Sequence, residues 1–163
     1  MADEAFTPEF PRDRQRRRGG EGGDCSRWVP AVPEGASIAR DHVRSALRHW
    51  RLDEHAVERA ALLVSELVTN AIVHGGRHRG SPPRMVWCHI QRTPDTVRLN
   101  VWGPPGTTVP RPRRSPEDAT GESWALPESG RGLLIVAAMS RAWGTRMGRV
   151  NRLVWAELSP HPL

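Results

Sequence analysis

The stretch between Asp53 and Gly75 constrains the fold of this chain more than any other part of the sequence. It contains no proline or glycine, and apolar residues such as Leu63 and Leu67 recur at the spacing that places side chains on one helical face. Asp53 is a favourable N-cap residue, and a glycine is a favourable stop signal. We therefore expect a long helix over residues 54–74, with an apolar face that must pack against another layer.

Periodicity in the rest of the sequence predicts the other elements of one α+β domain. A first helix is expected over residues 38–50 with Ser37 as its N-cap, and a third helix is expected to begin just after Gly130. Alternation of apolar and polar residues predicts strands over residues 85–91, 96–102, 144–150 and 152–158. This order predicts a two-layer α/β sandwich, in which helices cover one face of a mixed or antiparallel sheet.

Composition divides the chain into a tail, a domain and a long irregular segment. Residues 1–29 are rich in arginine, glycine and acidic residues, so we expect a disordered tail followed by one domain over residues 30–160. Within that domain, the proline-rich segment at residues 104–129 is expected to form a lid or a disordered loop. No stretch approaches the roughly 20 apolar residues of a membrane span, and no secretion signal is present, so a cytoplasmic protein is expected.

The chain carries a formal net charge of +6, and all 24 of its basic residues are arginine. A basic tail could bind nucleic acid, but the arginine-rich runs lack the interleaved aromatic residues of a base-stacking surface. We therefore favour a solvated tail over a nucleic-acid interface. The two cysteines, Cys25 and Cys88, lie too far apart in the sequence to form a metal-binding or redox motif.

Two short motifs carry the candidate chemistry. Glu66 and Asn70 lie one helical turn apart, at the border between an apolar and a polar arc of the second helix. There a carboxylate could accept a proton and an amide oxygen could hold Mg²⁺, although the same border suits ordinary surface residues. Gly130 and Gly132 flank Arg131 at the start of the third helix, where free N–H groups favour a phosphate. The same glycines would equally suit a flexible loop that caps the helix.

Together the two motifs resemble the GHKL ATPases, and more narrowly the bacterial anti-sigma-factor serine/threonine kinases. The resemblance rests on ELVTNAIVHGG in one helix, a strand hairpin, a Pro/Gly-rich segment, SGRGLLIV opening another helix, and the closing WGTR and RLVWAEL. It covers about residues 30–159 and implies the Bergerat-type ATP-binding fold. It also implies a kinase that uses ATP and Mg²⁺, phosphorylates a serine of a small antagonist protein and binds a sigma factor.

The resemblance assigns roles to individual residues. Glu66 matches the catalytic glutamate, which orients or deprotonates the attacking hydroxyl group. Asn70 matches the asparagine that holds Mg²⁺, and residues 130–132 match the segment whose backbone amides face the phosphates. His74 also fits the family's run of residues, and we expect it to have a structural role.

The sequence departs from this family where relatives bind adenine. Relatives end the second strand of the hairpin with an aspartate that accepts a hydrogen bond from the base, and Gly103 stands at that position. Alternation supports this alignment, since Gly103 continues the inward series Val97, Leu99 and Val101. Leu153 stands where relatives carry a threonine near the base. Losing one charge-assisted hydrogen bond costs about 1.5–3 kcal/mol, so both changes put ATP binding in doubt.

Two functions are consistent with these observations. The first is an ATP-binding regulatory protein that phosphorylates or sequesters a protein partner in transcriptional control. The second is a non-catalytic partner-switching module with a degenerate adenine pocket. Met85, Trp87 and Trp102 are expected on the open face of the sheet, where they could form a homodimer or partner surface, or be covered by the tail or the first helix.

Overall fold

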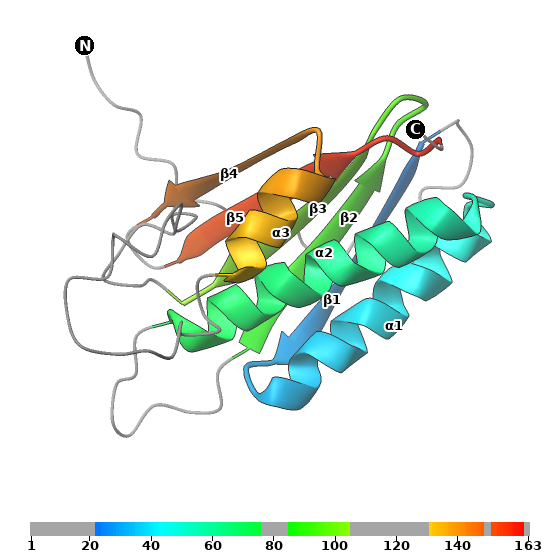
Figure 1. The fold of residues 1–163 in the computed structure, drawn as a ribbon. Coiled ribbons are helices and arrows are strands. Elements are labelled where there is room, and N and C mark those ends of the chain that lie inside the picture. The colour runs from blue at the N-terminus through cyan, green and yellow to red at the C-terminus, as the bar shows by residue number, and fades with distance from the viewer. Residues whose placement is uncertain (1–21, 76–84, 105–130, 149–150, 162–163) are drawn as a thin grey trace, which may run out of the picture.

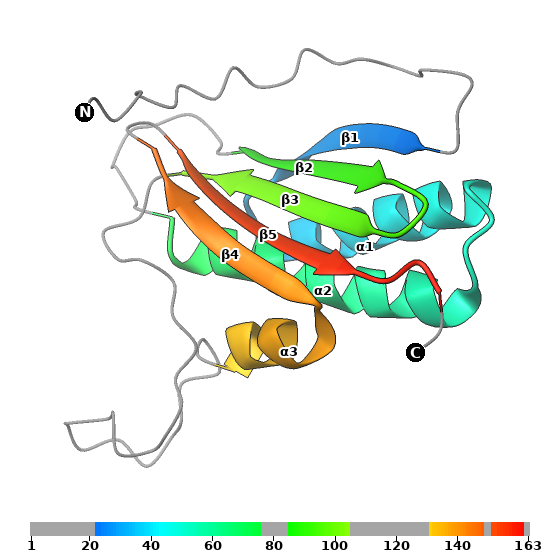
Figure 2. The same ribbon diagram turned by 90° about the horizontal axis from the view of Figure 1, so that it is seen from above.

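The computed structural model describes residues 22–75, 85–104, 131–148 and 151–161. These residues form a five-stranded antiparallel sheet with helices on one of its faces (Figures 1 and 2). The elements in chain order are β1 (Gly23–Pro30), α1 (Pro33–His49), α2 (Glu54–Val73), β2 (Met85–Arg92), β3 (Val97–Gly103), α3 (Arg131–Met139), β4 (Ala142–Met147) and β5 (Arg152–Leu158). The predicted two-layer α+β sandwich is confirmed.

The sheet has the strand order β1-β2-β3-β5-β4, and every neighbouring pair is antiparallel. The two predicted hairpins are β2–β3 and β4–β5, and β3 and β5 pair at the centre of the sheet. In this pair Val101 lies opposite Val154, and Gly103 lies opposite Arg152. Residues directly opposite each other share a face of the sheet, so these four lie on the helix-covered face.

The core lies between the sheet and α2, the central helix of the helical layer. Leu63 and Leu67 of α2 are fully buried, as are Val97, Leu99 and Val101 of β3, which confirms the predicted inward series. Full burial of one such side chain contributes about 1.5–3 kcal/mol. This packing fixes α2 over β3 and β5 and thereby sets where the polar residues near the end of α2 lie.

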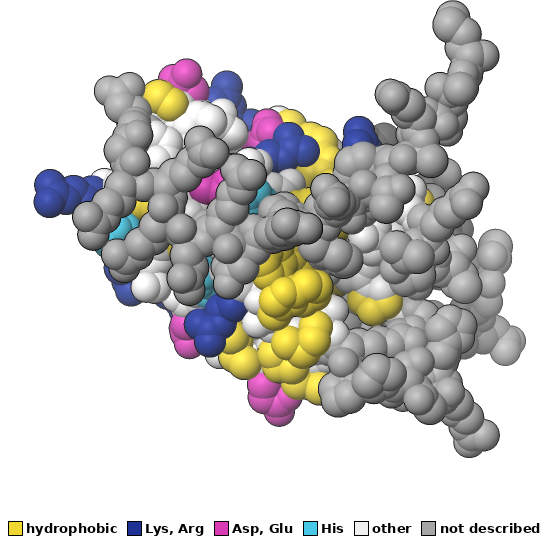
Figure 3. Space-filling view, turned by 180° about the vertical axis from the view of Figure 1, so that it is seen from behind, with side chains coloured by type: hydrophobic (Ala, Val, Ile, Leu, Met, Phe, Trp, Pro, Cys, Tyr) yellow, Lys and Arg dark blue, Asp and Glu magenta, His cyan; other side chains and the backbone are white. Residues whose placement is uncertain are grey.

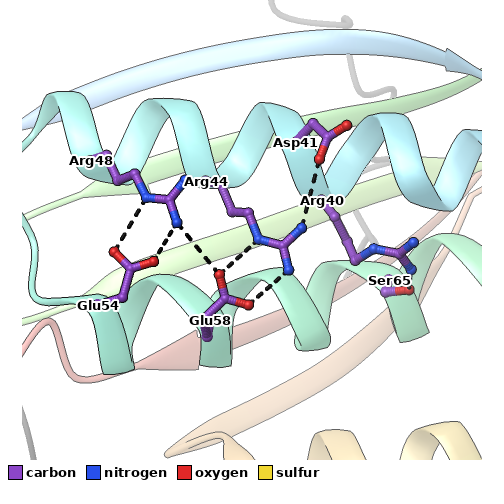
Figure 4. Close-up of polar contacts among 7 residues, drawn as sticks. All are labelled: Arg40, Asp41, Arg44, Arg48, Glu54, Glu58 and Ser65. Carbon is purple, nitrogen blue, oxygen red and sulfur yellow. Dashed lines mark hydrogen bonds and ion pairs between the residues drawn. The ribbon is translucent and has the colours of Figure 1, made fainter.

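A row of polar contacts on the outer surface holds α1 beside α2 (Figure 4). Its pairs are Arg48–Glu54, Arg44–Glu58 and Arg40–Ser65. In the central pair, the guanidinium of Arg44 donates from Nε and Nη2 to the two carboxylate oxygens of Glu58, at 2.8 and 2.7 Å. Exposed ion pairs contribute little to stability individually, so this row mainly orients the two helices.

The structure differs from the prediction at the start of the domain and at the start of the first helix. β1 was missed, because the composition of residues 1–29 suggests disorder; its ladder with β2, in which Trp28 lies opposite Trp87, orders this strand. α1 begins at Pro33 rather than after Ser37, because proline is favourable in the first turn of a helix.

The predicted cap of α2 is confirmed. Oδ1 of Asp53 accepts a hydrogen bond from the backbone N–H of Ala56 at 3.0 Å. Residues 1–21 of the expected tail, and the expected lid beyond Pro104, lie outside the described residues. None of the described helices is long and apolar enough to cross a membrane.

Candidate functional site

The candidate site lies near the C-terminal end of α2, where this helix meets the first turn of α3. A hollow of about 30 Å³ is lined there by Glu66, Thr69, Asn70, Val73, His74, Gly132 and Leu133. The structure thus brings together three of the predicted site residues, Glu66, Asn70 and Gly132. Gly130 and the side chain of Arg131 lie outside the described residues.

The carboxylate of Glu66 faces the backbone of Gly132. A Cβ atom added to Gly132 would collide with Oε2 of Glu66, so a larger residue there would displace this carboxylate from its present position. Glu66 is partly buried, and this burial raises the pKa of its carboxyl group. A raised pKa suits a group that accepts a proton near neutral pH, although burial alone also produces it.

Asn70 is more deeply buried than a residue at a helix border would be, with 7% of its surface exposed. Its backbone carbonyl accepts hydrogen bonds from the N–H of His74 at 3.0 Å and from Nη2 of Arg152 at 3.1 Å. Its side-chain Oδ1 accepts from the same Nη2 at 3.4 Å. His74 is the C-cap residue of α2 and borders the hollow.

Arg152, at the start of β5, was missed by sequence reasoning. It is the largest fully buried side chain among the described residues, with 1% of its surface exposed. Burial lowers the pKa of its guanidinium group. Within the described part of the chain, Nε and Nη1 have no hydrogen-bond partner and Arg152 forms no ion pair. Alternation could have found it, because Arg152 lies two residues before the inward-facing Val154.

The base side of the expected pocket differs from the prediction in one respect. Gly103 faces the helices, as alternation predicts, and a Cβ atom there would lie only 2.8 Å from the Cβ of Ala71. An aspartate therefore does not fit at this position unless α2 moves. The expected place of Leu153 beside the base is wrong, because it lies opposite Trp102 on the other face of the sheet. The inward position opposite Gly103 belongs to Arg152.

A Mg²⁺ ion does not fit beside Asn70 in this arrangement. The amide oxygen that would hold the ion already accepts a hydrogen bond from a buried guanidinium group. A divalent ion about 5 Å from that charge would be repelled by roughly 7 kcal/mol at an effective dielectric constant of about 20. The hollow itself has room for one or two water molecules, whereas ligand pockets usually measure about 300–1,000 Å³.

Comparison with known proteins identifies the family. The model of the histidine kinase-like ATPase domain matches residues 29–155. The chain belongs to this family. No curated protein matches the sequence.

A crystal structure of the RsbU and RsbW domains of Rv1364c from Mycobacterium tuberculosis has a similar fold. The TM-score is 0.57 at 16% sequence identity, over 86% of this chain and 33% of that one. The present chain thus spans about a third of the matched protein, and the likeness at this identity concerns the fold alone. For this histidine kinase-like ATPase domain, the expected family and α+β architecture are both confirmed.

Proposed function

We propose that this protein is a regulatory member of the histidine kinase-like ATPase family that controls a protein partner in transcription by binding it. The ATPase-type domain supports a regulatory role linked to a nucleotide. The resemblance of its motifs to anti-sigma-factor kinases supplies the class of partner, which is a sigma factor or an antagonist protein that carries an acceptor serine. In this proposal the ATPase-type site does not transfer phosphate, and the protein binds its partner whether or not Mg·ATP is present.

The contact between Arg152 and Asn70 is the observation that favours partner binding over catalysis. The guanidinium group donates to both oxygens of Asn70 and lies on the inward face opposite Gly103. Phosphoryl transfer needs positioned phosphates and neutralised charge, and this arrangement offers no place for the ion beside Asn70. Sequestration of a partner requires neither, so it is the mode that the geometry favours.

Kinase activity is the second candidate, and Glu66 is the observation that favours it. Its carboxylate lies against the first turn of α3, which carries Gly132, one of the two glycines matched to the phosphate-binding segment. Its pKa is raised by burial, as suits a group that accepts a proton from an attacking hydroxyl. In this candidate Glu66 would act on the acceptor serine, with ATP as the phosphoryl donor.

The open face of the sheet is the surface that we propose for a partner or for a second copy of the chain. Figure 3 shows hydrophobic side chains gathered on the face of the molecule opposite the helices. Trp28 and Met85 are 43% and 42% exposed, whereas Trp87 packs under Trp28 with ring centroids 4.8 Å apart. Sedimentation of the purified chain over a range of concentrations distinguishes a homodimer from a monomer that uses this face for another protein.

Capture from the native cell, with and without Mg·ATP, tests the proposed function. The tagged full chain is expected to retain the same sigma factor or antagonist protein under both conditions. It is also expected to transfer no label from γ-labelled ATP to that protein. Transfer that depends on Glu66, lost in Glu66→Gln, would establish the kinase instead. Failure to retain any protein of these two classes would contradict the proposal.

A further inference from the structure

Arg152 is a buried cation that pairs with no anion among the residues that the structure describes. The residue opposite it on β3 is Gly103, which offers no side chain, and the residue opposite it on β4 is Met147, which carries no charge. No ion pair to the guanidinium forms among the described residues. A buried charge is costly unless it is paired and hydrogen-bonded. Two hydrogen bonds from Nη2 to Asn70 compensate part of the cost of burying this guanidinium.

The side-chain oxygen of Asn70 therefore has two possible partners, a metal ion in the hollow and the guanidinium group of Arg152. On the hollow side, Asn70 is the residue that the family resemblance assigns to the metal and hence to the phosphates. On the sheet side, its Oδ1 already accepts a hydrogen bond from the guanidinium group of Arg152, whose Nε and Nη1 have no partner among the described residues. One amide oxygen cannot serve a divalent cation and a neighbouring guanidinium without a large electrostatic penalty.

We propose that Arg152 is an internal competitor of Mg-nucleotide at this site. Its guanidinium holds Asn70, so a nucleotide with its metal ion binds only after that contact is broken. The residue thus sets how strongly the site responds to nucleotide, which deepens the proposed function and rests on it. A nucleotide-insensitive binding protein arises in this way without the loss of Glu66, Asn70 or Gly132.

A purely structural arginine would behave differently from a competitor. If Arg152 only anchored β5 to α2, its removal would weaken the fold and leave nucleotide affinity unchanged or lower. If it competes for Asn70, its removal raises nucleotide affinity. The two roles therefore predict opposite signs for one measurement.

The test is calorimetric titration of the full chain with Mg·ATP, comparing the wild type with Arg152→Met and Arg152→Lys. Methionine keeps the apolar stem and removes the charge, so Arg152→Met is expected to bind at least about tenfold more tightly, the range that a charged hydrogen bond controls. Lysine keeps the charge, so Arg152→Lys is expected to stay close to the wild type. Arg141→Met, which removes an exposed positive charge at another place in the molecule, controls for net charge.

Circular dichroism checks that each variant is folded, and Arg152→Gln replaces Arg152→Met if the latter does not fold. Equal or weaker affinity in the folded charge-free variant, or no heat from either protein at millimolar Mg·ATP, overturns the proposal. These outcomes leave the capture of a partner untouched. Conversely, failure to capture a partner would contradict the proposed function but would not affect the ratio of the Mg·ATP affinities of Arg152→Met and the wild type.

Discussion

The apolar face of α2 differs from the C-terminal corner of the same helix, around Glu66 and Asn70, in how its side chains are buried. Along the apolar face, side chains such as Leu63 are fully buried against the sheet. At the corner, Glu66 faces α3, and Asn70 accepts from the buried guanidinium of Arg152, two of whose nitrogen atoms have no partner in the described part of the chain. Buried polar groups that are only partly satisfied are unfavourable for stability. The contrast therefore indicates that the apolar face serves stability, and it agrees with the proposal that the corner serves function.

The largest effect is expected on the apolar face. Replacement of Leu63 by alanine removes a fully buried side chain and leaves a cavity, so it should lower the free energy of unfolding by about 2–5 kcal/mol. The adjacent Leu62 is 39% exposed, and Leu62→Ala should change it by less than about 0.5 kcal/mol. Urea unfolding of both variants measures the difference. Similar losses at the two leucines would break the distinction between the buried face and the rest of the helix.

At the corner, removal of charge is expected to stabilise the ligand-free protein. Arg152→Met eliminates a buried and incompletely paired cation, and replacing such a group by an apolar one of similar size is often neutral or stabilising. We expect a gain of about 1 kcal/mol in the free energy of unfolding. The carbonyl of Asn70 keeps its hydrogen bond from His74, which limits the loss. A decrease beyond about 1 kcal/mol in urea unfolding would show that the corner also serves stability.

The same division describes what the sequence could predict. The apolar face follows from periodicity alone, because helical spacing and the Asp53 cap are local properties; both are confirmed. β1 could not be predicted in this way, since a strand of mixed residues is ordered by its partner β2.

At the corner, the motifs correctly placed Glu66, Asn70 and Gly132 together, but not the arginine behind them. Arg152 reaches Asn70 across 82 positions of sequence, and such a contact depends on strand register. An error of one residue in that register exchanged Leu153 for Arg152, because successive side chains of a strand point to opposite faces.

A smaller effect is expected at the N-terminal end of α2. Asp53→Ala removes the side-chain acceptor of the Ala56 N–H and should cost about 1 kcal/mol, the usual value of a helix cap. Asp53→Ser keeps an acceptor and should recover most of this loss. Thermal unfolding of the two variants provides the measurement. If both lose the same stability, the cap contributes nothing, and the helix start depends on packing and on the ion pairs with α1 alone.

The smallest effect on stability is expected at the carboxyl group of Glu66. Its dependence on pH tests whether the corner contributes to stability. Burial raises the pKa of Glu66 above the ordinary value of about 4.5, so the folded state favours the protonated form. The stability linked to this group is fully present below about pH 4.5 and is lost as the pH rises through the folded-state pKa. Glu66→Gln mimics the protonated form and should be more stable than the wild type at pH 7, by less than about 0.5 kcal/mol because the group is partly exposed. The difference should vanish near pH 4 in parallel urea titrations. A glutamine variant less stable than the wild type at pH 7 would instead show that the ionised carboxylate makes a favourable contact with the first turn of α3, and the corner would then contribute to stability as well as to function.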